Sequence, residues 1–327
     1  MKTRLAALLL ALALLCGCAA QRAAYTLPDM PTVDEAPSPT PTPEPTPDPD
    51  AARYGSVRLL KEPTVLVSVY LNDAATGSIW TQEARAETQR CLAMAVEWIE
   101  AQAAGHGART ELYYDDGSAG SPLQCTYAVQ SRLRGGVDSE ESAAFLDEMD
   151  ALCATLDTAE LRAQYGTDNI GFLLFLPVRG TSFTMAHYAD DGFDFYHEYC
   201  CLYRYDAYAE QIEPESPATY AHEILHLFGA PDLYEGSADP YVDGELTAYV
   251  EQTYPDEIML STYDPDGENV YTAIEKTLSP LTAYCLGLVN SCPELPLFPQ
   301  LADVEPGVFY YGGAAQDLWP GSGVIAV

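Results

Sequence analysis

The chain has 327 residues, of which 48% are hydrophobic and 20% are charged, a composition typical of a globular protein with ample material for a core. Its 15 Lys and Arg residues stand against 49 Asp and Glu residues, so the formal net charge is −34. Such an acidic surface repels nucleic-acid phosphates and anionic lipid headgroups, which argues against nucleic-acid binding and against membrane binding through the protein surface.

Residues 1–17 are predicted to be a signal peptide. A short basic start precedes an apolar run over residues 5–15, which is too short to span a bilayer. Leu15 stands three residues before Cys18, and Gly17 stands directly before it, which resembles the lipobox of bacterial lipoproteins. The resemblance implies lipidation of Cys18 and a place at the surface of a bacterium, anchored to the outer face of the cytoplasmic membrane or secreted. The alternative is an ordinary cleaved signal whose cysteines are accidental.

Residues 18–53 are predicted to be a tether without a core of its own. Within it, APSPTPTPEPTPDPD over residues 36–50 has proline at alternate positions, which favours an extended, polyproline-like spacer. A generic disordered tail would have the same composition. The order of anchor, spacer and domain favours a tether that holds a domain of residues 54–327 away from a cell surface.

The domain is expected to belong to the α+β class, with a mixed twisted sheet and packed helices. Runs rich in Val, Leu, Phe and Tyr predict strands, and apolar residues at helical spacing predict helices. The predicted strands are 64–71, 109–115, 169–178, 182–189 and 197–206, and the predicted helices are 80–101 and 139–156, with Ser139 capping the second.

The most informative stretch is HEILHLFGAPDLY, over residues 222–234. Ser216 and Pro217 are typical of a helix start, so we expect a helix over residues 217–228 that places His222 and His226 one turn apart on one face. Both imidazoles can then bind one cation. Gly229 stands where a helix commonly ends in a left-handed residue.

Two acidic residues complete the candidate site. Glu223 lies next to the first ligand, from where it can reach a metal-bound water, and Asp232 follows ten residues after His222, where it could close the coordination sphere. Two other interpretations stay open: core histidines that only form hydrogen bonds, and a metal site without catalysis. Glu235 could replace Asp232 as the third ligand, and Asp232 could instead orient a histidine.

The pattern H-E-x-x-H-x-x-G-x-x-D resembles the zincin metallopeptidases in their metzincin layout, with Asp in place of the usual third His. The ending after Gly229 is similar to secreted bacterial proteases of the immune-inhibitor-A type. The resemblance implies a zinc ion, a methionine turn at Met259, and a smaller C-terminal subdomain that includes a capped helix within residues 279–289. The family's tyrosine position falls on Ser261, so Tyr263 is a weak candidate for that role.

The resemblance further implies a surface-anchored, zinc-dependent endopeptidase. His222, His226 and Asp232 would hold Zn²⁺, and Glu223 would act as general base towards a zinc-bound water. The substrate would be a peptide or protein, bound along the strand that precedes the active-site helix or along the strand paired with it. Two alternatives remain: a non-catalytic ligand- or partner-binding lipoprotein with a structural zinc, and a zincin that acts on glycoproteins.

Seven further cysteines follow Cys18, an odd number for intramolecular disulfides. Cys91 and Cys153 fall on apolar helix faces and suit reduced core positions. Cys200 and Cys201 are neighbours on a predicted strand and should point to opposite faces. A disulfide between Cys285 and Cys292 is possible.

Overall fold

The computed structural model describes residues 56–73, 77–131, 140–186, 197–237, 239–304 and 306. All of them lie in one unit, Pro47–Val327. The predicted signal peptide, Cys18 and the predicted tether lie outside the described residues, and so does Ser139, the predicted helix cap.

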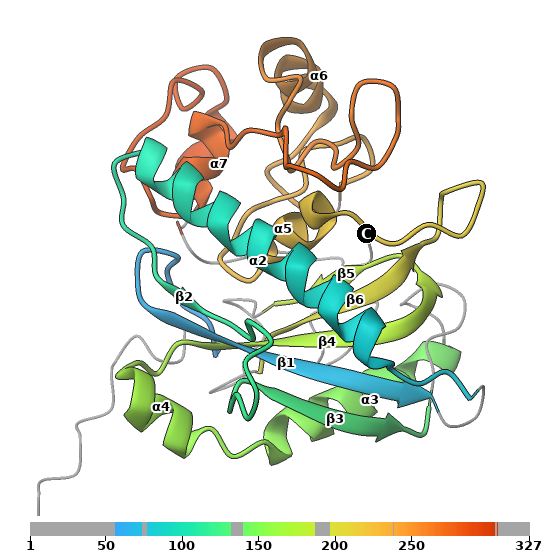
Figure 1. The fold of residues 1–327 in the computed structure, drawn as a ribbon. Helices are drawn as coiled ribbons and strands as arrows, with labels where there is room; N and C mark the ends of the chain where they lie inside the picture. Colours follow the sequence, from blue (N-terminus) through green and yellow to red (C-terminus); the bar gives the residue numbers. More distant parts are fainter. Residues whose placement is uncertain are drawn as a thin grey trace, which may run out of the picture. The chain divides into compact units, whose positions relative to one another are not determined.

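The centre of the described fold is a mixed sheet in which parallel pairing predominates (Figure 1). Its strands are joined in the order β2-β1-β4-β6-β5, and β3 pairs with β1 farther along that strand. All pairs are parallel except β5 with β6. The strands are β1 (Thr64–Asp73), β2 (Leu112–Tyr113), β3 (Gln124–Val129), β4 (Ile170–Gly180), β5 (Phe183–Met185) and β6 (Tyr199–Asp206).

The three long strands β1, β4 and β6 are apolar along almost their whole length because both faces of the sheet are covered. Alternate residues enter two separate cores: Leu173 packs on one side of β4 and Leu174 on the other. Cys200 and Cys201 of β6 likewise lie in opposite cores, as their adjacent positions predict.

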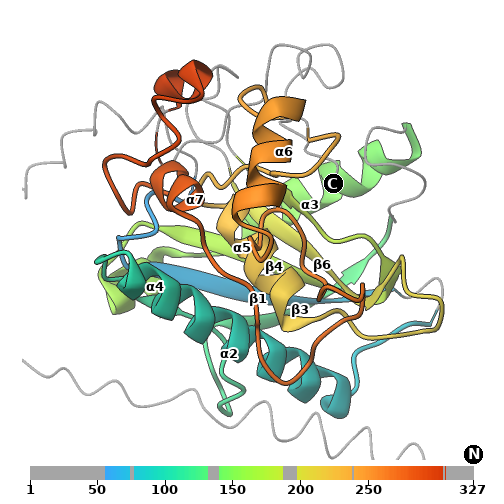
Figure 2. The same cartoon turned by 90° about the horizontal axis from the view of Figure 1, so that it is seen from above.

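Helices cover both faces of the sheet (Figures 1 and 2). On one face lie α2 (Gln82–Gly105) and α5 (Pro217–His226), which pack against each other, and on the other lie α3 (Glu140–Thr155) and α4 (Ala159–Tyr165). The later elements pack on α5 and extend its core. They are α6 (Gly244–Thr253), α7 (Pro280–Cys285) and the short 3₁₀ helix η2 (Pro299–Asp303). No helix of the described residues has both the length and the apolar character needed to cross a bilayer.

Most predicted elements form close to the expected residues, and two are shorter. The strand expected over 109–115 is limited to the two residues of β2, because Asp115 turns inward and accepts hydrogen bonds from Tyr70 and from the Gly117 amide. The strand expected over 182–189 is β5, three residues long, and residues 187–189 lie outside the described part. The strand β3 and the helices α4 and α6 are not predicted from the sequence.

The first described residues are fixed beside the amino ends of β4 and β6. The Val57 amide donates to the Glu198 carboxylate, while the Glu198 amide donates to the hydroxyl of Ser56. The Arg58 amide donates to the side-chain oxygen of Asn169. The chain therefore joins the sheet at the end where its parallel strands begin.

The cysteines of the described residues are all free thiols. Cys91 and Cys153 are buried in the cores, as their helix positions predict. Cys285 and Cys292 are also both free, so the possible disulfide between them is not formed.

Candidate metal centre

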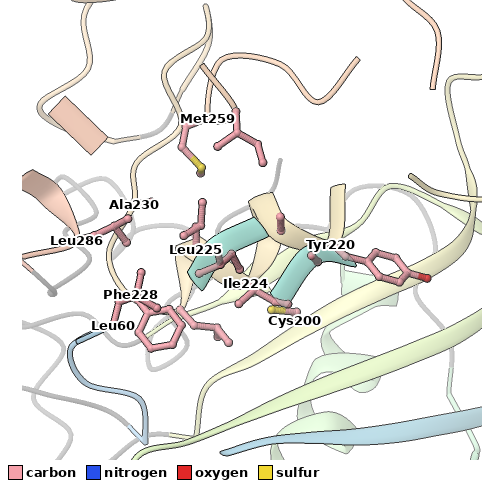
Figure 3. Packing of buried hydrophobic residues seen from close by; sticks show 14 of the residues in the cluster. Leu60, Cys200, Tyr220, Ile224, Leu225, Phe228, Ala230, Met259 and Leu286 are labelled. Carbon is pink, nitrogen blue, oxygen red and sulfur yellow. The ribbon is translucent and has the colours of Figure 1, made fainter. Parts of the chain in front are cut away.

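Helix α5 carries the candidate site and is buried on nearly all sides. The Ser216 hydroxyl caps it by accepting the Thr219 amide, and Pro217 occupies a first-turn position where no amide partner is lost. Figure 3 shows Ile224 and Leu225 of this helix among buried side chains that include Met259. A helix enclosed in this way holds its histidines in fixed positions.

The chain turns sharply after α5. The helix ends at His226, two residues earlier than predicted, and the Ala230 amide donates back to the carbonyl of Leu225. Gly229 has a φ of 93°, a conformation that side-chain-bearing residues rarely adopt. This reversal brings Asp232 back beside the two histidines.

Replacing Gly229 with alanine is expected to lower the free energy of unfolding by about 1–2 kcal/mol, because a Cβ is disfavoured at positive φ. Gly244→Ala is the matched control, since Gly244 has no positive φ and its Cβ would meet no atom within 4 Å. Denaturant unfolding of both variants measures the effect. Equal stability of the two variants would show that the turn tolerates a side chain.

Three buried donor atoms face one another behind this turn. His222 Nε2 and His226 Nε2 lie 3.1 Å apart, and Asp232 Oδ1 lies 3.2 Å from the first and 3.3 Å from the second. These three residues form a group that could hold a metal ion. Donors at ordinary tetrahedral N and O distances from one ion lie about 3.3 Å apart, so the triangle suits such an ion.

Backbone carbonyls fix the orientation of both imidazoles. His222 Nδ1 lies 3.1 Å from the carbonyl oxygen of Ile258, and His226 Nδ1 lies 2.7 Å from that of Ala230. Because a carbonyl only accepts, each Nδ1 carries the proton, and in the neutral ring Nε2 is free to bind a cation.

A cation would also balance the buried negative charge of Asp232. Asp232 Oδ2 accepts the hydroxyl of Tyr234 at 2.9 Å, but the buried Oδ1 has no well-aligned hydrogen bond of its own. Burial alone would lower the pKa of His226. The neighbouring Asp232 has the larger effect and raises this pKa to about 9. Burial acts against ionisation of Asp232, but the two histidines hold its pKa well below its usual range. A metal ion would supply the positive charge that a proton supplies here.

Glu223 lies beside the donor triangle without belonging to it. Its Oε2 accepts a hydrogen bond from the hydroxyl of Thr184 in β5 at 2.7 Å. Burial raises the pKa of this carboxyl. Glu223 and His222 line a cavity of about 270 Å³, so a small molecule in the cavity can reach both the carboxylate and the metal-binding group.

The remaining predicted site residues, Met259, Tyr263 and Glu235, lie outside the donor triangle. Met259 is fully buried directly after Ile258, and its carbonyl accepts the Leu233 amide, so it supports the segment that holds His222. Tyr263 lines the cavity but donates its hydroxyl to Asp206. Glu235, the alternative third ligand, is exposed and is not part of the donor group.

Several residues of the site could not be identified from the sequence. Thr184 comes from a short strand, and Asp206 and Glu215 line the cavity from the end of β6 and the segment before α5. Tyr234 belongs to the quoted motif, yet its bond to Asp232 follows only from the folded turn.

Comparison with known proteins adds no assignment: no protein-family model matches this chain, and neither a curated protein nor a solved structure matches it. What the site can do therefore has to be inferred from its own donors, their burial and the cavity beside them.

Proposed function

We propose that the protein is a zinc-dependent endopeptidase with a metzincin-like arrangement of its active-site helix and C-terminal subdomain. The observation that carries this proposal is the placement of Glu223 and His222 in the wall of one cavity, with His226 and Asp232 completing a donor triangle behind them. Two imidazoles and one carboxylate are a ligand set typical of catalytic zinc, which takes three protein ligands and leaves one position open.

Zinc in this position would supply a Lewis acid, which acidifies water and polarises a carbonyl group. His222, His226 and Asp232 would hold it through Nε2, Nε2 and Oδ1. Glu223 accepts a proton from the attacking water on its carboxylate and passes it to the leaving amine of the substrate. The hydroxyl of Thr184 orients that carboxylate by donating to Oε2.

An extended peptide would bind by pairing with a strand of the sheet. Among the described residues, β6 pairs on both sides, whereas β5 pairs only with β6 and forms the edge of the sheet. Thr184 of this strand touches Glu223, but all three residues of β5 are buried, so its edge is not open to a peptide. Substrate would pair with the strand that precedes the active-site helix or with the strand paired with it, as expected from the sequence.

Cleavage of a peptide library, with and without a zinc chelator, tests the proposal. We expect hydrolysis of internal peptide bonds that stops on chelation and returns when one equivalent of zinc is added. Absence of cleavage by fully zinc-loaded protein would contradict the peptidase proposal and favour a ligand- or partner-binding protein in which zinc has a structural role.

The same proposal places the enzyme at a bacterial surface, because Cys18 is preceded by the lipobox-like residues Leu15 to Gly17. Cys18→Ala is expected to abolish incorporation of labelled fatty acid and to release the protein from the membrane fraction. Cys16→Ala is the matched control and should leave both unchanged. Wild-type protein found free in the medium, with an N-terminus at another residue, would contradict lipidation.

A further inference from the structure

The cavity beside Glu223 has an acidic wall that the proposed chemistry does not use. Asp206 and Glu215 line it together with Glu223 and His222, and none of the described residues that line it is Lys or Arg. Asp206 is 1% exposed and Glu215 is 5% exposed. Two carboxylates buried away from water are costly to a fold unless a positive group pairs with them.

Among the described residues, the hydrogen-bond partners of the Asp206 carboxylate are neutral, and the Arg179 guanidinium bonds to the backbone carbonyl of Asp206. Its Oδ2 accepts the hydroxyl of Tyr263 and the side-chain amide of Asn269, and its Oδ1 accepts the backbone amide of Tyr208. These donors hold the carboxylate in a fixed place without cancelling its charge.

Among the residues that the structure describes, none that lines the cavity with Glu215 is a lysine or arginine. Burial and the charge of Asp206 raise the pKa of Glu215 to about 8, and Glu223 acts in the same direction. A cation bound in the cavity would favour the charged form of this carboxyl.

A loop with an exposed tyrosine borders the cavity. Residues 207–213 follow β6, and Arg179 holds this loop by donating to the carbonyls of Asp206, Ala207 and Ala209. Tyr208 lines the cavity and is 72% exposed, and Leu260 also lines it. An aromatic ring and an apolar side chain beside two buried carboxylates suit the aliphatic stem and charged head of lysine or arginine.

We infer that this cavity binds the side chain of a lysine or arginine next to the scissile bond, so that the enzyme cleaves peptides at basic residues. The inference deepens the proposed function and rests on it, because the cavity shares Glu223 and His222 with the candidate catalytic centre. Glu215 and Asp206 select the cation, and Tyr208 contacts its stem.

The test compares arginine with citrulline, which has nearly the same shape and no charge. Matched peptides carry one or the other on either side of the cleaved bond. We expect the wild type to favour arginine in kcat/KM, and Glu215→Gln to reduce that preference by about 10–100-fold, the scale of one charge-assisted hydrogen bond. Hydrolysis of the citrulline peptides should fall much less than hydrolysis of the arginine peptides.

Two further variants test whether the preference for arginine depends on the carboxylates in the cavity. Glu210→Gln removes one exposed charge from the same loop and should keep the preference for arginine. Asp206→Asn should reduce it, as Glu215→Gln does. An enzyme that cleaves without preferring arginine, or whose preference survives both cavity variants, would overturn the inference while leaving the peptidase proposal intact.

A binding measurement separates the two proposals. Calorimetric titration with N-acetyl-arginine amide and N-acetyl-citrulline amide needs no catalysis. Stronger binding of the arginine compound, lost in Glu215→Gln, would support the cavity's role even in a protein that hydrolyses nothing. Equal binding of the two compounds to the wild type would overturn it. Thermal unfolding of each variant confirms that the fold is retained.

Discussion

Glu223→Gln is expected to keep its zinc and to lower the rate of peptide hydrolysis by about 10²–10⁴-fold, the usual scale for loss of a general base. Glutamine has nearly the same size and can still accept the hydrogen bond from Thr184, so the helix packing should be preserved. It cannot take up a proton from water at neutral pH. The rate has to be measured at equal zinc content in both proteins.

Glu251→Gln is the matched control. Glu251 is an exposed residue of α6, so this substitution removes the same charge away from the site. It should hydrolyse peptides at the wild-type rate. If Glu223→Gln also retains the full rate at full zinc occupancy, Glu223 has no part in the reaction and its bond to Thr184 is only structural.

Loss of any one ligand is expected to remove tightly bound zinc and, with it, peptide hydrolysis. His222→Ala and His226→Ala each take away one of two imidazoles, and Asp232→Ala takes away the anionic donor. Removing a group that only orients a ligand lowers metal affinity by about 10–100-fold, so loss of a ligand itself should exceed that range. Elemental analysis and competition with a fluorescent chelator measure the effect.

Two variants near Asp232 distinguish the loss of a zinc ligand from the loss of a neighbouring group. Tyr234→Phe removes only the hydrogen bond to Oδ2, so its zinc affinity should fall by about 10–100-fold while the metal still binds. Glu235→Gln should bind zinc as the wild type does, since Glu235 is exposed outside the donor group. Unchanged affinity in Asp232→Ala would show that the third ligand lies elsewhere.

The donor group could be predicted from the sequence because its geometry is local. A helix from Pro217 fixes His222 and His226 one turn apart, and Gly229 returns the chain so that Asp232 reaches them. The positions of these three residues relative to one another depend only on the helix and turn geometry of the eleven residues from His222 to Asp232. The same holds for Ser216 and Ser279, which cap their helices as their positions before proline predict.

The surroundings of the donors could not be predicted, because they come from distant segments. The Ile258 carbonyl that orients His222 is 36 residues away, and Thr184, which binds Glu223, is 39 residues away. Sheet register and helix packing bring them together, and neither can be read from one sequence. The acidic cavity wall is unforeseen for the same reason, since Asp206 and Glu215 stand on separate segments.

Among the secondary-structure elements, those with a broad apolar face were predicted and those with a narrow one were not. The strands β1, β4 and β6 contain long apolar runs because they are covered on both sides. Only Val129 of β3 is buried, α4 buries only Leu161, and α6 buries only Leu246, Thr247 and Val250. Such short elements form because neighbouring parts of the chain hold them.

The attachment of the chain ahead of Ser56 and the acidic cavity lie at opposite ends of the same strands. Ser56 and Val57 are bound to Glu198 beside the start of β6, whereas Asp206 ends that strand in the cavity wall. Eight strand residues extend about 25 Å. A purification tag, a bead or any other support joined just ahead of Ser56 should therefore leave a bulky folded substrate free to approach, whereas the same insertion in residues 207–213 should obstruct it.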